Sequence, residues 1–320
     1  MIRHLLLLAC TLVVPVSAST AASDAQAFDF GTLDYRITFG GDDIAWREFA
    51  FYVMPGDTLP LEVHVNGDSE VEISHDGGRL DMQSTHQGVW TAPGQSGLYT
   101  LTIQPQGRES MRLNVLVKVP LVADEIEELD GYRIGRYPDQ ALRGNPIYLP
   151  PHGLVEVTPE LIDLKISPHF TLGQFLCKQQ PDHWPKYLVL REALVAKLEI
   201  ILAEVNRRGI RADSFVVMSG YRTPWYNQAI GNGQYSRHQW GGAADIYIDT
   251  NGDGRMDDLN GDGRSGLRDA RLLLGIIEDL YQVSEYAHLH GGLGLYGPRS
   301  HRGAFVHVDA RGHEARWELP

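Results

Sequence analysis

Residues 236–245 read Ser-Arg-His-Gln-Trp-Gly-Gly-Ala-Ala-Asp, and residues 305–309 read Phe-Val-His-Val-Asp. The first stretch places a histidine and an aspartate seven residues apart across small residues, and the second places a histidine at a strand-like position. His238, Asp245 and His307 together offer three ligands and leave one coordination position open, as in a catalytic Zn²⁺ site. These two stretches therefore predict a zinc centre around which the C-terminal half of the chain folds.

The residues around these ligands suit hydrolysis by a metal-activated water. Gly241 and Gly242 let the backbone turn, so that His238 and Asp245 can meet one ion. Zn²⁺ lowers the pKa of a bound water and polarises a scissile carbonyl. Arg222 lies just upstream, and its planar, permanently charged guanidinium is suited to gripping a substrate carboxylate.

Four segments in this order resemble peptidase family M15, the zinc D-Ala-D-Ala carboxypeptidases and murein endopeptidases. They are the Gly-Tyr-Arg-Thr segment at 220–223, the Ser-x-His-x-x-Gly-x-Ala-x-Asp segment at 236–245, the turn at 292–296 and the segment at 305–309. The resemblance implies an α+β zinc D,D-peptidase-like domain with a small antiparallel sheet at 166–320. It also implies that peptidoglycan stem peptides are the substrate, that Arg222 contacts the substrate and that Ser236 lies near the ligands.

One position departs from the family. Many members place Glu or Asp three residues before the last histidine ligand as the general base, and here that residue is Ala304. Asp309 shares a strand face with His307, so it is a candidate either for the base or for a partner that orients the ligand. His290 and His301 are further candidates for the base.

An acidic, glycine-rich insertion at 249–269 separates the two halves of the zinc site. One register has the spacing of an EF-hand or dockerin-like Ca²⁺ loop, with the ligands Asp258, Asn260, Asp262, Arg264 (through its carbonyl) and Asp269. A second, overlapping register offers Asp249, Asn251, Asp253 and Asp257. The alternative is a solvated acidic turn without an ion.

Residues 28–120 show period-two alternation between turn signals, as in Leu61 and Val63 around Glu62. This pattern predicts an all-β sandwich, and the Trp90–Tyr99 segment resembles bacterial immunoglobulin-like modules. Residues 121–165 read as an extended, Pro-punctuated connector whose apolar residues pack along the next domain. Helical periodicity at 187–207 and 270–281 then marks the C-terminal domain.

The N-terminus reads as a signal peptide at 1–22, which predicts export to the periplasm or beyond. A lipoprotein signal ending at Cys10 is a weaker interpretation. Cys177 would then be the only cysteine left, so no internal disulfide is expected and Cys177 is interpreted as a buried apolar residue. A net charge of −13 argues against a nucleic-acid partner, and no segment is long and apolar enough for a transmembrane span.

These observations favour an exported zinc metallopeptidase acting on peptidoglycan. The absence of an acid at Ala304 keeps open a catalytically silent module that binds wall peptides. The acidic loop keeps open a calcium-dependent adhesion or assembly protein.

Overall fold

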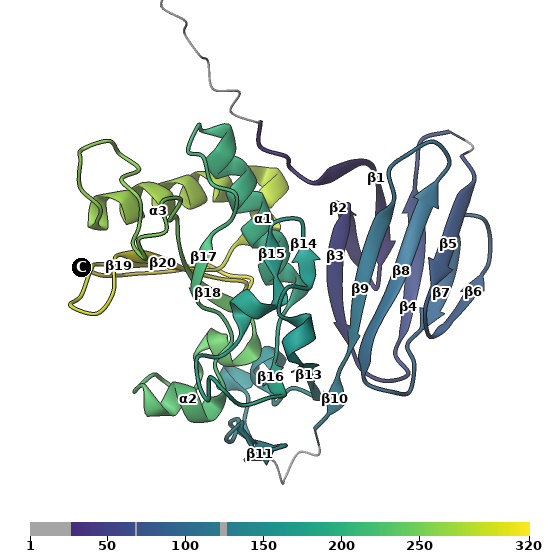
Figure 1. Ribbon diagram of the computed structural model, residues 1–320, viewed down its shortest axis with the longest axis horizontal. Coiled ribbons are helices and arrows are strands. Elements are labelled where there is room, and N and C mark those ends of the chain that lie inside the picture. The colour runs from purple at the N-terminus through teal and green to yellow at the C-terminus, as the bar shows by residue number, and fades with distance from the viewer. Residues whose placement is uncertain (1–26, 68, 122–126) are drawn as a thin grey trace, which may run out of the picture.

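The computed structural model describes residues 27–67, 69–121 and 127–320, and the signal peptide expected at 1–22 lies outside them. Within this described part the chain is mostly β, with several sheets and few helices (Figure 1). The prediction of a β-rich fold is confirmed at this level. No helix in these ranges has the length and apolar content needed to cross a membrane.

Two sheets face each other in the N-terminal part of Figure 1. The first has the order β2-β1-β4-β7-β6 and contains β1 (Thr32–Phe39), β2 (Asp42–Trp46), β4 (Thr58–His64), β6 (Arg79–Met82) and β7 (Gln87–Thr91). The second has the order β3-β9-β8-β5 and contains β3 (Glu48–Val53), β5 (Val71–His75), β8 (Gly97–Pro105) and β9 (Met111–Val117). Phe39 and Phe51 meet edge to face with ring centroids 4.8 Å apart, so the sheets share one apolar core.

The segment interpreted as a connector contains short elements of its own. These are β11 (Glu128–Leu129), β12 (Tyr132–Arg133), η1 (Leu142–Gly144), η2 (Pro146–Tyr148), β13 (Gly153–Val157) and η3 (Pro159–Leu161). β13 pairs with both β10 (Val119–Pro120) and β16 (Lys186–Leu188). The connector is therefore hydrogen-bonded to the C-terminal half and is not a free linker.

The C-terminal half is built on a sheet with the order β17-β18-β20-β19-β21. Its strands are β17 (Val216–Ser219), β18 (Ala243–Tyr247), β19 (Gly292–Tyr296), β20 (Phe305–Asp309) and β21 (Ala315–Leu319). The expectation of an antiparallel sheet is wrong for one pairing, because β21 runs parallel to β19. The chain reverses after β19 and again after β20, and β21 then returns to the free side of β19.

Two long helices cover one face of this sheet. α1 (Glu192–Arg207) packs against α3 (Leu267–Tyr281), which contacts β19 and β20. The helix expected from residue 187 begins only at Glu192, because residues 186–188 pair with β13 as a strand. The remaining elements are short: β14 (Lys165–Ser167), β15 (Phe170–Thr171), η4 (Leu172–Phe175), α2 (Pro224–Ala229), η5 (Arg237–Trp240) and η6 (Ser284–Leu289).

Cys177 follows η4 and is buried, as expected for a small apolar side chain. Burial raises the pKa of its thiol to about 11. A thiol with so high a pKa carries little thiolate at neutral pH and is a poor nucleophile.

Candidate metal centre

The register of β18 and β20 brings Asp245 and His307 together, because the two residues lie directly opposite each other. Their strand neighbours Ala244, Ile246 and Val306 belong to the apolar core. Successive side chains of a strand point to opposite faces, so Asp245 and His307 share the face that the helices leave uncovered.

His238 reaches the same point from η5, the helical turn that precedes β18. This turn ends at Gly241, which has a φ of 61°. A Cβ on Gly241 would lie 2.2 Å from the carbonyl oxygen of Val189. Only glycine tolerates both this backbone conformation and this close approach. Gly241 thus supplies the backbone turn between His238 and Asp245.

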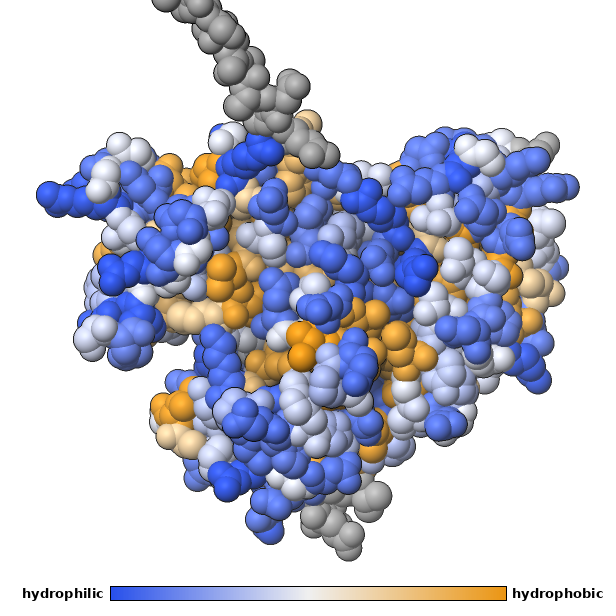
Figure 2. All heavy atoms as spheres, in the orientation of Figure 1, coloured by the Kyte–Doolittle hydropathy of each residue, from blue (hydrophilic) through white to orange (hydrophobic). Residues whose placement is uncertain are grey.

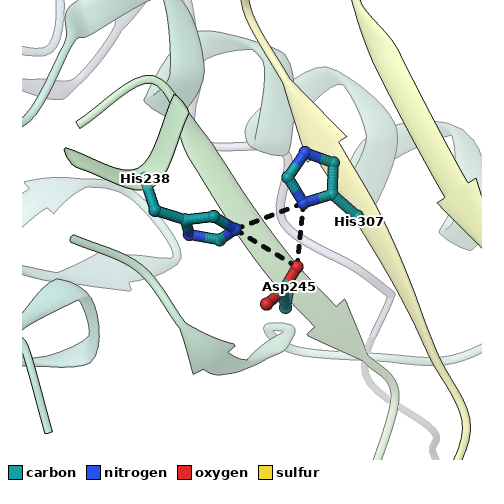
Figure 3. Close-up of side chains that lie close together, drawn as sticks. All are labelled: His238, Asp245 and His307. Atoms are coloured by element: carbon teal, nitrogen blue, oxygen red, sulfur yellow. Dashed lines mark hydrogen bonds and ion pairs between the residues drawn. The ribbon is translucent and has the colours of Figure 1, made fainter. Parts of the chain in front are cut away.

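The three side chains point toward one another (Figure 3), and one ligand atom of each lies within 4.8 Å of the others. Nδ1 of His307 lies 3.2 Å from Nε2 of His238 and 2.9 Å from Oδ1 of Asp245. All three residues are buried. This group could hold a metal ion, and two imidazole nitrogens with one carboxylate oxygen form a donor set that suits Zn²⁺.

In each of the two histidines, the ring nitrogen that points away from the other ligands, here called the outer nitrogen, also has a hydrogen-bond partner. Nδ1 of His238 lies 2.7 Å from the carbonyl oxygen of Gly220, so this nitrogen carries a proton and donates it. Nε2 of His307 lies 3.3 Å from Oδ2 of Asp309. Each contact holds the proton on the outer nitrogen and leaves the inner lone pair for a metal ion.

Asp309 is fully buried and surrounded by donors. Its Oδ1 accepts the backbone N–H of Gly292 at 2.8 Å, and the guanidinium of Arg311 donates to both of its carboxylate oxygens. Burial acts to raise the pKa of Asp309, but hydrogen bonds from His307 and Arg311 hold it well below its ordinary value. Such a stabilised anion is a poor proton acceptor. Of its two expected roles, this environment therefore suits the orientation of His307.

The two ligand histidines have opposite pKa shifts. Burial lowers the pKa of His238 below 6.5. Burial acts in the same direction on His307, but its hydrogen bonds to Asp245 and Asp309 raise its pKa above 6.5. Burial acts to raise the pKa of Asp245, yet the two histidines hold it well below 3.8. In the metal-free site a proton therefore resides preferentially on His307.

Arg222, expected to grip the substrate, also contacts a metal-site residue. Its Nη2 donates to Oδ2 of Asp245 at 2.5 Å, and its Nε donates to Oγ of Ser219 at 2.8 Å. Arg222 thus binds one carboxylate oxygen of Asp245, while the other carboxylate oxygen of Asp245 faces the two histidines. It also lines the adjoining cleft, as does Ser236, which precedes η5. Both residues therefore line the same cleft as the three candidate ligands, and their roles stay predictions.

The site lies in a cleft of about 1030 Å³, and Figure 2 shows the surface hollowed between the part that carries α2 and the part that carries β19 and β20. Its charged lining comprises five cations and one carboxylate, namely Lys178, Arg222, Arg237, Arg302, Arg311 and Asp245. Arg222 is paired with Asp245 and Arg311 with the buried Asp309, so the positive charge of the cleft comes from Lys178, Arg237 and Arg302, in a chain whose net charge is −13. The cleft is suited to an anionic ligand. Sequence reasoning missed Lys178, Arg302 and Arg311, because they belong to no motif, and it gave no role to Arg237 inside its motif.

Ala304 is buried and contributes no proton acceptor. Among the described residues that line the cleft, Asp245 is the one carboxylate. His301 also lines the cleft, is exposed and makes no hydrogen bond within the described part of the chain. His290 lies apart from the cleft, where its Nε2 is 3.0 Å from the carbonyl oxygen of Tyr281.

The acidic insertion forms two turns with the same hydrogen-bond pattern, nine residues apart. The carboxylate of Asp249 accepts the backbone N–H groups four and five residues later, and Asp258 does the same. The turns pass through Gly254 and Gly263, whose φ values are 78° and 77°. The repeated motif therefore produces repeated local structure.

Asp269, the expected twelfth ligand, is buried at the start of α3 and accepts the backbone N–H groups of Leu259 and Gly266. The other expected calcium ligands lie in the same two turns: Asn251, Asp253, Asp257, Asn260, Asp262 and Arg264. The carboxylates of the loop accept hydrogen bonds from the backbone N–H groups of the same loop. Over the described ranges, the group of ligand atoms that converges as a metal site is the one at His238, Asp245 and His307. Calcium binding stays a prediction.

No family model matches the chain, and a search of curated proteins gives no match either. The functional interpretation therefore depends on the geometry of the site and on the motifs that build it.

Proposed function

We propose that this chain is an exported zinc metallopeptidase that hydrolyses peptide bonds in peptidoglycan stem peptides, as a D,D-carboxypeptidase or endopeptidase. The observation that carries the proposal is the convergence of Nε2 of His238, Oδ1 of Asp245 and Nδ1 of His307. Gly220 and Asp309 hold both histidines in the tautomer that ligates a metal. The residues present therefore fit Zn²⁺.

Bound Zn²⁺ would supply an activated water and a polarised carbonyl. The other steps fall to side chains of the chain. Arg222 holds Asp245 through one oxygen and presents its remaining N–H groups to the cleft, where a substrate carboxylate can accept them. Asp309 is committed as an anion, so we assign proton transfer to His301, the exposed imidazole of the cleft wall.

The cationic cleft supports a substrate with free carboxylates, and the motif resemblance together with the expected export signal directs this choice to peptidoglycan. We propose that the protein is located in the periplasm or outside the cell. We interpret the sheets at 28–120 as an immunoglobulin-like domain that helps to position the substrate. We also propose that the loop at 249–269 binds Ca²⁺ and stiffens the chain after Asp245.

Two other functions remain open. A catalytically silent module that binds metal and wall peptides is favoured by Ala304 and by the lack of a second carboxylate among the described cleft residues. A calcium-dependent adhesion or assembly protein is favoured by the acidic loop alone.

Digestion of purified muropeptides distinguishes these functions. We expect the wild type and a control, His152→Ala on an exposed loop, to release D-Ala or to split cross-links. We expect His238→Ala to lose both zinc, measured by metal analysis, and all cleavage. Binding of muropeptides by the zinc-loaded wild type without cleavage would select the silent module. Wild-type protein that takes up no zinc would contradict the metal site.

A further inference from the structure

Three hollows follow one another along α2, beginning at the metal cleft. The second hollow has a volume of about 610 Å³ and shares wall residues with the metal cleft, among them Gln234 and Tyr235. The third has a volume of about 370 Å³ and shares Pro224 and Gln228 with the second. Because adjoining hollows have wall residues in common, they lie side by side and mark a path that leads away from the metal. The second and third hollows together are called the α2 groove.

Side-chain amides give the α2 groove its chemistry. Gln140, Gln228, Asn232 and Gln234 are exposed in its wall, and their side chains make no hydrogen bond within the described part of the chain. An amide offers donors and an acceptor at once, which matches the hydroxyl and acetamido groups of a sugar.

A buried acceptor also belongs to this wall. Asn227 is 1% exposed, and its Nδ2 donates to the carbonyl oxygen of Gly233 at 3.0 Å, but its Oδ1 has no partner. Buried polar atoms in folded proteins nearly always find a partner. This oxygen is closed to solvent, so a hydroxyl in the groove would reach it only after the side chain of Asn227 turned toward the groove.

The far end of the groove carries an exposed aromatic ring. Trp225 is 38% exposed in the third hollow, and the guanidinium of Arg133 lies 4.7 Å from its ring centroid. The guanidinium covers one indole face, so the C–H groups of a sugar ring would pack on the part of the ring that stays exposed. An exposed tryptophan beside free amides is the chemistry that recognises an uncharged sugar.

The charge changes along the path. In the metal cleft Arg222 is paired with Asp245 and Arg311 with Asp309, and Lys178, Arg237 and Arg302 are further cations. The α2 groove has two arginines and three carboxylates in its lining, and Arg136 is paired with Glu127 at 2.9 Å. The path therefore suits a ligand whose anionic part lies near the metal and whose neutral part lies along α2.

We propose that the α2 groove binds the N-acetylated sugar chain to which the stem peptide is attached, so that the peptide reaches the metal from the glycan side. The position of the peptide rests on the proposed peptidase function, whereas sugar binding can be measured without it.

Titration with a hexamer of N-acetylglucosamine, followed by calorimetry, tests the groove directly because this probe contains no peptide. We expect Trp225→Ala to weaken binding about tenfold and Gln228→Ala to weaken it several-fold, since they remove a stacking surface and an amide. Gln282→Ala, at an exposed glutamine directly after α3, is the matched control and should bind as the wild type does. Thermal unfolding of each variant reports whether the fold is retained.

A second measurement compares a disaccharide-linked pentapeptide ending in D-Ala-D-Ala with the free pentapeptide as substrates of the zinc-loaded protein. We expect kcat/KM to be about tenfold higher for the linked substrate through a lower KM, and Trp225→Ala to remove this difference. Hydrolysis with equal kcat/KM and no binding of the hexamer overturns the groove proposal and leaves the peptidase intact. Binding of the hexamer without hydrolysis of either substrate leaves the groove and contradicts the peptidase. Binding of free peptide in place of the hexamer, lost in Trp225→Ala, makes the groove a peptide subsite and overturns the sugar assignment.

Discussion

His307 has an acidic neighbour at each ring nitrogen. Nδ1 lies 2.9 Å from Asp245, and Nε2 lies 3.3 Å from Asp309. These hydrogen bonds outweigh burial and raise the pKa of His307 above 6.5. A protonated imidazole cannot ligate a metal, so protons compete with Zn²⁺ at this residue. Metal affinity should therefore fall as the pH drops through the raised pKa of His307.

Asp309→Asn tests this coupling. We expect zinc affinity at neutral pH to fall about 10–100-fold, because the anion that orients and polarises His307 is removed. The same change lowers the pKa of His307, so the acid loss of metal should move to lower pH. Titration against a chelator at several pH values measures both effects. Asp213→Asn, at an exposed aspartate, is the control, and an unchanged affinity in Asp309→Asn would rule out the orienting role.

Arg222→Lys separates the two roles of this arginine. Lysine keeps the charge but cannot contact Ser219, Asp245 and a substrate carboxylate with one planar group. We expect zinc content to remain near that of the wild type while KM for peptides with a free carboxylate rises about tenfold or more. Steady-state kinetics, together with metal analysis of the same samples, distinguishes substrate binding from metal retention as the role of Arg222. A loss of activity that only follows a loss of zinc would mean that Arg222 acts on Asp245 alone.

At the scale of single elements, the strands and the acidic loop follow local sequence closely. β4 buries Leu59, Leu61 and Val63 in alternation, and the loop repeats one turn at a spacing of nine residues. Such patterns depend on side-chain alternation and on glycine at left-handed positions, which act over a few residues. Elements that depend on distant partners behave differently, as residues 186–188 show by pairing with β13 instead of beginning a helix.

The loop gives a prediction at this scale. Calcium should raise the thermal unfolding temperature of the wild type by about 2–4 °C for each kcal/mol of binding energy. Asp258→Asn should lose part of this shift because it removes a charged ligand, whereas Asp163→Asn at an exposed site outside the loop should keep it. Thermal scans in calcium and in chelator measure the effect. Equal unfolding temperatures in both conditions, with no calcium in the purified protein, would contradict a calcium site.

At the scale of the whole molecule, the N-terminal sheets and the C-terminal half are joined by buried polar contacts as well as by apolar packing. Asn114 of β9 is 1% exposed, and its Nδ2 donates to Oε1 of Glu48 at 3.0 Å and to the carbonyl oxygen of Lys165 at 2.8 Å. The backbone N–H of Tyr52 donates to Oε1 of Glu192 at 2.9 Å. These contacts link β9 and β3 to β14 and α1, and one apolar core extends through both halves.

Asn114→Leu tests this link. We expect the free energy of unfolding to fall by about 1–3 kcal/mol, because the buried carbonyl of Lys165 loses its donor. Urea unfolding should show a single transition in the wild type, since the core is shared. Gln95→Leu, at an exposed position in the turn between β7 and β8, should have little effect. Two separated transitions in the wild type would show that the halves unfold independently.

The sequence by itself identified the alternation of the N-terminal strands, the two acidic turns and the three residues that could hold a metal. Periodicity and motif spacing encode these features, because each depends on side chains a few positions apart. His307 is the exception, because it is far from the other two ligands in the sequence. The strand motif around it was specific enough to identify it.

Only the tertiary structure decided which partners these residues meet. It showed Asp309 surrounded by Gly292, Arg311 and His307, and it placed Arg222 on Asp245. It also assembled the cationic cleft and the α2 groove from segments far apart in the chain. The physical reason is that hydrogen bonding, desolvation and charge depend on neighbours in space, and those neighbours come from strand pairing and helix packing that no local pattern specifies.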